Sequence, residues 1–597
     1  MADAEAPDEG VPSRGEGIAI GLALDPAARK RTRRTAKRSA EEQFLAAESR
    51  KLELEMHHLR LSHFDRLLTV ALKLMTAALG LLIAVALAVM IFSAARADSV
   101  VVSAFQTPPM LAAEGLNGAV VASKLLDKLQ DLQSNTQAAA AHRGLRDAWS
   151  ADIKVEVPET GVSIGELQRY LRDWLGHEIH VGGDLEAVGD RLSLTVRGDG
   201  FEARTFEGAR ADLLNLVSQA AEYIYGEAEP YLAADYYSTH GRDQDAVRLV
   251  QAKYASARPA DQPFLLNAWG NALVDLDRTS EALPKYQEAL SLKPDYWIAD
   301  SNLMSAQWGQ GREEDAWRTG EAMAKAARRG QIGQKTLDTY FQPLDDMTQN
   351  LAGLRGELVA DLARHGGVGS ALVQARPLIA ATSVRMHDLQ SAELYLETSD
   401  EAATSPWVVA ITHFVRGWSA MDRGDWAGAL PDMEAFGAAY ANPVIKAAVP
   451  GYACWVAPAE EMSGRSDKAD AALKAGGRFV DCYRFRGDIL DHRGDWAGAQ
   501  RAYADAVALA PDLPAAYYSW GLALARRGDL AGAQAKYAAA QARGPHWADP
   551  LKSWGDALAA QGRWDEAVAK YEQAIAYAPR WRALQAALAE ARRHRPV

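Results

Sequence analysis

The chain contains only two cysteines among its 597 residues. So few thiols exclude a disulfide framework and a cysteine-rich zinc site. Motifs that carry chemistry are also missing, because there is no glycine-rich phosphate loop ending in Lys-Ser or Lys-Thr and no His-Glu-x-x-His. We therefore expect a protein without enzymatic activity, cofactor or metal ion.

Basic residues are too few to balance the acidic ones, and the formal net charge is −13. Residues 1–73 hold 13 basic and 12 acidic side chains, so the acidic excess lies in the remainder of the chain. A surface of that sign repels a phosphate backbone. We expect no general nucleic-acid binding.

One long apolar run stands out, because Leu74 to Ala95 contains no charged residue. Its 22 residues would reach about 33 Å as a helix, enough to cross a hydrocarbon core of roughly 30 Å. Alternatives are a buried helix of a soluble protein and a signal peptide cleaved at Ala97. The 73 residues before the run and its length favour a stable single-pass anchor at 74–95.

Basic residues predict the orientation of this anchor. Arg60, Arg66 and Lys73 precede the run closely, whereas only Arg96 follows it closely. The positive-inside rule then places the amino terminus in the cytoplasm of an inner (plasma) membrane protein and the carboxyl-terminal domains outside, in the periplasm if the source is a bacterium.

The cytoplasmic arm reads as a disordered stretch over 1–38 and a juxtamembrane helix over 39–73. The stretch 29–38 is rich in basic residues and contains no acidic residue. It is expected to lie on anionic lipid, or else to bind nucleic acid or an acidic partner. Its basic residues are Arg29, Lys30, Arg31, Arg33, Arg34, Lys37 and Arg38. In the anchor itself, small residues four apart (Thr76, Gly80, Ala84 and Ala88) would allow a homodimer.

A short phrase recurs in the second half of the chain. Gly-Asp-Trp-Ala-Gly-Ala at 494–499 is followed at intervals of 34 residues by related phrases at 528–533 and 562–567, and the phrase also stands at 424–429. Around it a set of small, aromatic and proline positions stays in phase. In one unit this set is Gly487, Gly494, Ala499, Tyr503, Ala506 and Pro511. A fixed period of this length predicts stacked helical hairpins.

These positions resemble the tetratricopeptide repeat (TPR) family over about 226–581, with departures at 331–405 and a capping helix at 582–597. The resemblance implies a mainly α chain, a TPR-type α-solenoid that binds protein partners. In such a solenoid the first helix of each unit lines a groove. The candidate groove residues are Asp481, Arg484, Asp488, Asp491, Tyr518, Lys552 and Asp556.

Between anchor and repeats, residues 98–225 predict a small α/β domain. Strands are expected at Val100–Phe105, Ile153–Val157, Ile179–Val181, Leu192–Arg197 and Phe201–Phe206, and helices at Leu116–Leu132, Ile164–Leu175 and Ala209–Tyr225. The layout, with a hairpin turn at Asp199-Gly200, resembles the TolB-type amino-terminal domain and the FlgO-like and CsgG-like folds of bacterial envelope proteins. That family includes cyclases, but 73 residues before the anchor are too few for a cyclase domain.

Cys454 and Cys482 are predicted in the first helices of neighbouring units. Adjacent helix axes lie about 8–10 Å apart, whereas a disulfide needs Cα atoms within about 7 Å, so the geometry disfavours a bond. An oxidising compartment would favour it.

Two functions fit these patterns. One is a membrane-anchored, non-enzymatic scaffold whose groove binds an extended polar or basic segment, with an aromatic or apolar side chain of that segment near Tyr518. The other is an envelope sensor whose α/β domain binds a small ligand and signals through the TPR array. For the groove, the alternative is a solvated charged face without a ligand.

Overall fold

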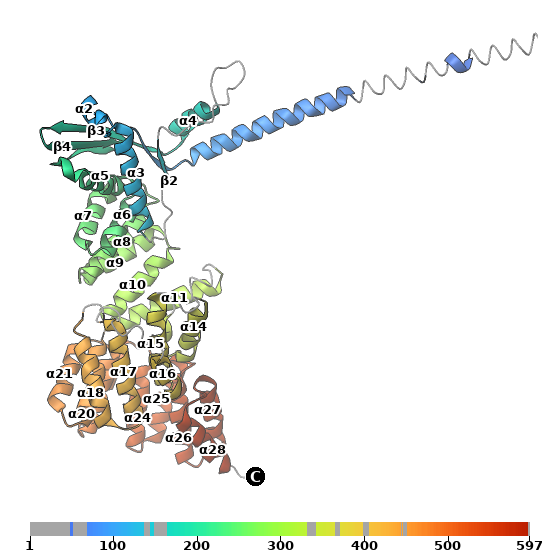
Figure 1. Cartoon of the computed structure of the whole chain (residues 1–597). Coiled ribbons are helices and arrows are strands. Elements are labelled where there is room, and N and C mark those ends of the chain that lie inside the picture. Colours follow the sequence, from blue (N-terminus) through green and yellow to red (C-terminus); the bar gives the residue numbers. More distant parts are fainter. Residues whose placement is uncertain are drawn as a thin grey trace, which may run out of the picture. The chain divides into compact units, whose positions relative to one another are not determined.

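The computed structural model describes residues 48–51, 56, 68–136, 144–147, 164–330, 342–364, 370–397, 405–442, 445 and 451–594 (Figure 1). The chain forms two compact units. The first comprises Met1–Ser99 and Ser150–Glu178, and the second comprises Val100–Trp149 and Ile179–Val597.

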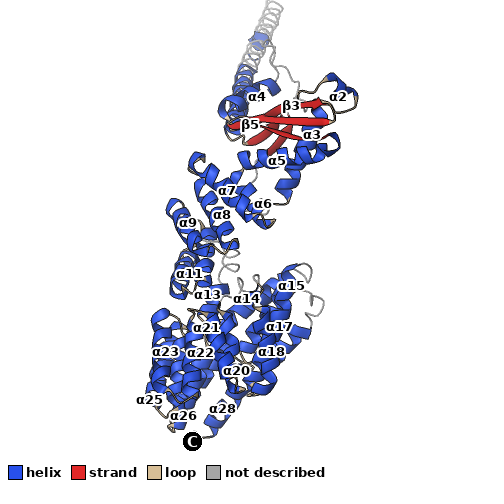
Figure 2. Cartoon of the chain, turned by 90° about the vertical axis from the view of Figure 1, so that its left-hand side faces the viewer, coloured by secondary structure: helices blue, strands red, loops and turns tan. Residues whose placement is uncertain are grey.

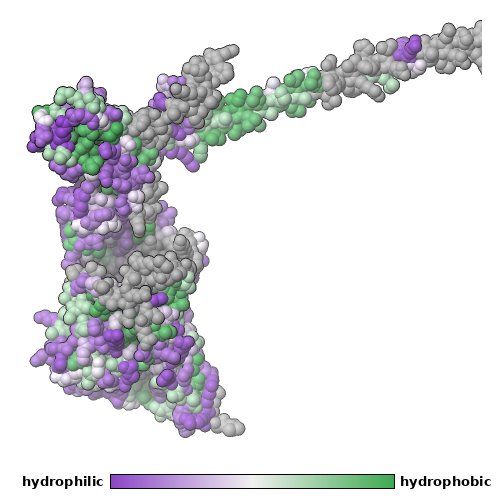
Figure 3. Space-filling model, in the orientation of Figure 1, coloured by the Kyte–Doolittle hydropathy of each residue, from purple (hydrophilic) through white to green (hydrophobic). Residues whose placement is uncertain are grey.

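The first unit contains the helix Leu68–Ala95, whose 28 residues are long and apolar enough to cross a membrane. Its large apolar side chains are exposed and form the green stretch in Figure 3. The helix starts six residues before the expected Leu74 and includes Lys73, because a lysine near a helix end does not interrupt the backbone pattern. The basic run and most of the predicted juxtamembrane helix lie outside the described residues, although 48–51 and 56 are helical.

The second element of this unit is α4 (Ile164–Leu175), at the bounds predicted from the sequence. The segment after α4 bonds to the segment after the apolar helix. His177 N donates to the carbonyl of Ala97 at 2.8 Å, and Ser99 Oγ donates to Glu178 Oε1 at 2.8 Å.

The second unit opens with a five-stranded sheet, drawn in red in Figure 2, in the order β2-β1-β3-β4-β5. Strand β1 pairs parallel with β3, while β3, β4 and β5 form an antiparallel meander. The strands are β1 (Ser99–Val102), β2 (Gly144–Asp147), β3 (Ile179–Val188), β4 (Arg191–Gly198) and β5 (Phe201–Ala209). Buried side chains of α3 (Gly118–Ser134) and α5 (Leu213–Ala228) share one core with the sheet, and α2 (Pro109–Ala113) adds Leu111 to it.

The sheet follows the predicted order with two differences. Strand β3 extends to Val188 and pairs with β4 from Val181 onward, because cross-strand pairing overrides the weak strand propensity of Gly182, Gly183 and Asp184. The strand before α4 lies at Gly144–Asp147, where the sequence pattern predicts no strand. The stretch predicted as a strand at 153–157 lies outside the described residues.

Helices make up the rest of the second unit, in a TPR-type α-solenoid. The first group is α6 (Pro230–Thr239), α7 (Asp243–Lys253), α8 (Gln262–Asp275), α9 (Thr279–Leu292), α10 (Trp297–Gly309) and α11 (Glu313–Arg328). The middle group is α13 (Gln342–Met347), α14 (Leu351–Arg364), α15 (Ser370–Arg385), α16 (Leu389–Glu397), α17 (Pro406–Asp422), α18 (Trp426–Ala439), the 3-10 helix η4 (Tyr452–Val456), α20 (Ala457–Met462) and α21 (Ser466–Gly476). The last group is α22 (Val480–His492), α23 (Trp496–Leu509), α24 (Ala515–Arg526), α25 (Leu530–Arg543), α26 (Ala548–Ala560), α27 (Trp564–Tyr577) and α28 (Arg582–Arg593).

The repeated phrase is the turn between the two helices of a unit. Gly494 has φ +85°, a left-handed conformation that ends α22 at little cost for glycine. Asp495 then caps α23, because its side chain accepts a hydrogen bond from Gly498 N at 2.8 Å. Asp425 and Asp529 cap α18 and α25 in the same way. The phrase therefore encodes one helix stop and one helix start.

Candidate interaction surface

Two of the candidate groove residues accept hydrogen bonds inside their own repeat units. Tyr503 is buried in α23 and donates its hydroxyl hydrogen bond to Asp488 of α22 at 2.7 Å. Tyr571 makes the same bond to Asp556 at 2.8 Å, and Tyr286 makes it to Asn271 at 2.9 Å. The carboxylates at 488 and 556 thus satisfy a buried tyrosine. The sequence indicates this role, because the equivalent position of an earlier unit holds Asn271, another side chain that can accept a hydrogen bond from tyrosine.

The remaining acidic positions differ in accessibility. Asp491 accepts hydrogen bonds from Arg526 and Arg527 of the next unit, and its side chain is only 6% exposed. Asp481 pairs with Arg484 at 2.6 Å. The side chains of Asp488 and Asp556 remain 30% and 44% exposed. A ligand could reach these two carboxylates, whereas Asp491 is committed to joining two repeats.

Tyr518 and Lys552 lie on α24 and α26. The Tyr518 hydroxyl lies 3.3 Å from Ser553 Oγ, and its ring contacts Trp547 edge-on. Lys552 Nζ bonds Asp556 at 2.7 Å and lies 5.6 Å from the centre of the Trp581 ring. The structure thus brings the predicted residues of α24 and α26 into one layer of polar and aromatic contacts. Their role in binding a partner stays a prediction.

Helix α11 and the middle group of helices contact the carboxyl-terminal units. We call residues 478–480, 510–515, 544–549 and 579–581 the loop edge, where α22, α24, α26 and α28 begin. Glu313 accepts a hydrogen bond from Val480 N at 2.6 Å, and Glu314 accepts one from Asp512 N at 3.1 Å. Arg580 Nη1 donates to Ser391 Oγ at 2.7 Å. Carboxylates of α11 therefore bond backbone N–H groups at the starts of two distant units.

A largely buried charged cluster lies beside this contact, in a cavity lined also by Glu313 and Val480. Arg385 at the end of α15 forms an ion pair with Asp346 of α13 and also donates to Gln349. The Tyr452 hydroxyl donates to the same aspartate at 3.2 Å. Burial raises the pKa of Glu313 to about 8. Sequence periodicity could not reveal this cluster, because its members are far apart in the chain.

His387 contacts two residues of the loop edge, Trp581 and Asp549. Its ring stacks on Trp581 at 3.8 Å between centres and lies between Asp422 and Asp549. Burial lowers the pKa of His387, but the two carboxylates more than offset this and raise it to about 9. His387 also has φ +58° at the position where other units carry the turn glycine. Histidine in place of glycine at this turn could have indicated a special role from the sequence alone, because a non-glycine residue rarely adopts this conformation.

The expectation against a disulfide was wrong. Cys454 and Cys482 form one, with Cα atoms 5.4 Å apart. The expected separation of the two cysteines supposes that they lie on two regular helices packed side by side. Cys454 instead belongs to η4, and this irregular segment brings it against the start of α22. Both Sγ atoms lie within 3.4 Å of the carbonyl oxygen of Gly451.

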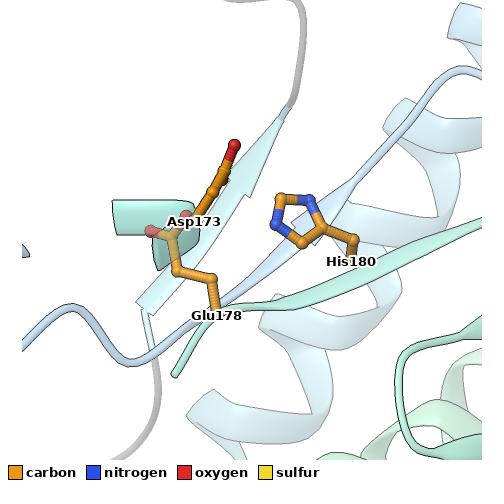
Figure 4. Close-up of side chains that lie close together, drawn as sticks. All are labelled: Asp173, Glu178 and His180. Carbon is orange, nitrogen blue, oxygen red and sulfur yellow. The ribbon is translucent and has the colours of Figure 1, made fainter. Parts of the chain in front are cut away.

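We assign no site to two local patterns. Figure 4 shows Asp173, Glu178 and His180, but the carboxylates belong to the first unit and the histidine to β3 of the second, so we assign no metal site to them. Residues 161–165 read Gly-Val-Ser-Ile-Gly, a Gly-x-Ser-x-Gly pattern that the sequence reasoning missed. Its serine lies outside the described residues.

Comparison with known proteins matches residues 548–581, which hold α26 and α27, to the tetratricopeptide repeat family. No curated protein matches the chain. Among solved structures, the APC/C hetero-tetramer Cut9-Hcn1 aligns with a TM-score of 0.37 at 14% identity, over 64% of this chain and 87% of that one. Yeast Tom70 aligns with a TM-score of 0.28 at 13% identity, over 64% and 82%.

Proposed function

We propose that this protein is a membrane-anchored, non-enzymatic scaffold that binds protein partners through its TPR solenoid. The phased repeat carries the proposal. Its turn caps, buried tyrosines and fixed period build the kind of extended helical surface that holds other proteins. The tetratricopeptide match at 548–581 supports this reading.

The proposed location is the extracytoplasmic side of the inner membrane, in a bacterium the periplasm. The helix Leu68–Ala95 supplies the anchor, and the basic residues before it favour a cytoplasmic amino terminus. The disulfide between Cys454 and Cys482 also supports the proposal, because such bonds persist in oxidising compartments.

The proposed ligand of the groove is an extended polar or basic segment of a partner protein. Asp488 and Asp556 direct partly exposed carboxylates there, with Asp481 and Arg484 beside the first and Lys552 beside the second. Tyr518, which is partly exposed and packs on the buried Trp547, offers an aromatic contact to the same segment. The exposed edges of these two carboxylates favour hydrogen bonds from cationic groups and disfavour a carboxylate tail.

The test removes the charge of Asp488 and Asp556 and keeps an acceptor for each buried tyrosine, while Asp556→Asn gives up the ion pair with Lys552. Asp488→Asn and Asp556→Asn keep an acceptor for Tyr503 and Tyr571, as Asn271 does for Tyr286. Partners of the wild-type chain are first identified by crosslinking and affinity capture from membranes. We expect the double variant to lose that capture while its helical circular dichroism stays unchanged.

The matched control is Asp505→Asn, which removes an exposed carboxylate from the second helix of the same unit. Capture should survive in this control. If the double variant still captures the partner, the groove at this end of the solenoid is not the binding site, although the scaffold proposal then remains open at other surfaces.

The sensor alternative and the homodimer stay predictions. No observation on the described residues favours a ligand site in the α/β domain. Gly80 has open space around its Cα, which fits close helix approach but does not by itself indicate a second copy.

A further inference from the structure

Helix α4 has an unusually complete division into an apolar and a polar face. At 100° per residue, Tyr170, Trp174, Leu167, Leu171 and Leu175 occupy an arc of about 140°. The opposite arc carries Glu166, Gln168, Arg169, Arg172 and Asp173. A helix of this pattern needs an apolar environment along one side only.

The structure leaves the Tyr170 and Trp174 side of that face exposed, whereas it partly covers the leucine side. The side chains of Tyr170 and Trp174 are 70% and 81% exposed. Leu167, Leu171 and Leu175 are only half-buried, and none of the α4 residues from 165 to 175 is buried. Large aromatic side chains with a polar tip are enriched where apolar and aqueous phases meet.

The carboxyl-terminal end of α4 is tied to the end of the apolar helix. A Cβ on Gly176 would lie 3.0 Å from the carbonyl oxygen of Ala94, which shows how closely the two segments approach. The hydrogen bond from His177 N to Ala97 O and the bond between Ser99 and Glu178 fix the same junction. Helix α4 therefore ends at the point where the proposed anchor leaves the bilayer.

We propose that α4 is an interfacial helix, lying in the headgroup region of the same membrane with Tyr170 and Trp174 toward the acyl chains. This inference rests on the proposed membrane anchoring and adds a second contact with lipid. An anchored position raises the local lipid concentration, so twelve residues suffice where a free helix of this length would bind weakly.

The charges of α4 determine which lipids it is expected to bind. Arg169 and Arg172 are balanced by Glu166 and Asp173, so the helix has no net charge. Burial of apolar area must then supply the binding free energy. We expect contact with uncharged phosphatidylcholine vesicles, without a requirement for anionic lipid.

The experiment uses the full chain reconstituted in such vesicles. The two native cysteines are disulfide-bonded, so without reductant a thiol-reactive fluorophore labels only an introduced cysteine. Trp174→Cys and, separately, Tyr170→Cys report the apolar face. Glu166→Cys is the control on the polar face, and Leu82→Cys reports the anchor. Quenching is measured with phospholipids carrying a nitroxide at a shallow or a deep position.

At positions 170 and 174 we expect loss of fluorescence with the shallow quencher that exceeds the loss with the deep one, and little loss at 166. Position 82 should respond to the deep quencher. Quenching at 82 without quenching at 170 and 174 would overturn the interfacial helix and leave the anchor intact. Absence of quenching at 82 would remove the anchor and this inference together. Quenching at 170 and 174 that needs anionic lipid would also contradict the proposal.

Discussion

At the scale of single residues, the repeats depend on contacts that allow no additional atom. A Cβ on Gly487 would lie 2.5 Å from Cε1 of Tyr503. The tyrosine cannot move aside, because it is buried and bonded to Asp488. The same contact recurs between Gly521 and Tyr537.

We therefore predict that Gly487→Ala destabilises the solenoid. Overpacking of this kind costs about 1–3 kcal/mol, more than the helix propensity that alanine adds. Urea unfolding followed by circular dichroism measures the loss. The control is Gly356→Ala in α14, where a Cβ meets nothing within 4 Å and a slight stabilisation is expected. Equal midpoints for the two variants would contradict the packing argument.

His387 makes stability depend on pH. Its pKa is raised to about 9 in the folded chain, against about 6.5 for an unperturbed histidine. The protonated form is therefore favoured by folding. Its contribution is complete below about pH 6.5 and is lost as the pH rises through about 9.

The variant His387→Gly, which restores the turn residue of the other units, tests this. The difference in unfolding free energy between wild type and variant should shrink by up to about 3 kcal/mol between pH 6.5 and 9.5. Chemical denaturation at a series of pH values gives the difference. A difference that stays constant across this range would show that the histidine does not carry a proton at the loop edge.

At the scale of elements, irregular segments decide how the regular ones meet. The 3-10 helix η4 brings Cys454 to α22, and the disulfide closes a loop across a sequence separation of 28 residues. Closing such a loop restricts the unfolded chain and stabilises the fold by about 3–4 kcal/mol.

Intact mass with alkylation before and after reduction should show no free thiol until reductant is added. Reductant should then lower the unfolding midpoint of the wild type. A Cys454→Ala/Cys482→Ala double variant should start at the lower midpoint and show no further change. If reductant shifts both proteins equally, the bond is not the cause.

At the scale of the whole molecule, the proposed topology places most of the chain on one side of a membrane. Protease added to intact spheroplasts should degrade the region from 98 to 597, whereas the amino-terminal arm should be protected. An epitope at each end distinguishes the fragments, and lysed spheroplasts serve as the control in which both ends are cleaved. Protection of the TPR region in intact spheroplasts would reverse the proposed orientation.

The fold class was predictable because its signals are local and repeated. Glycine at the turn, aspartate at the cap and tyrosine opposite glycine recur in phase, so one unit explains the others. Helix α4 was predicted at its observed bounds for the same reason, since its apolar period lies within twelve residues. Strand β3 was predicted too short, because its outer half depends on pairing with β4.

The sequence by itself determined the helical hairpins, the apolar helix and the order of the small domain, because periodicity and turn chemistry act over a few residues. Only the tertiary structure decided the loop edge. The contacts of Glu313 with Val480 and of His387 with Asp549 span 167 and 162 positions. No periodic pattern links such residues. They meet because the solenoid turns back on itself, and the curvature that turns it is a sum of small packing angles over many units.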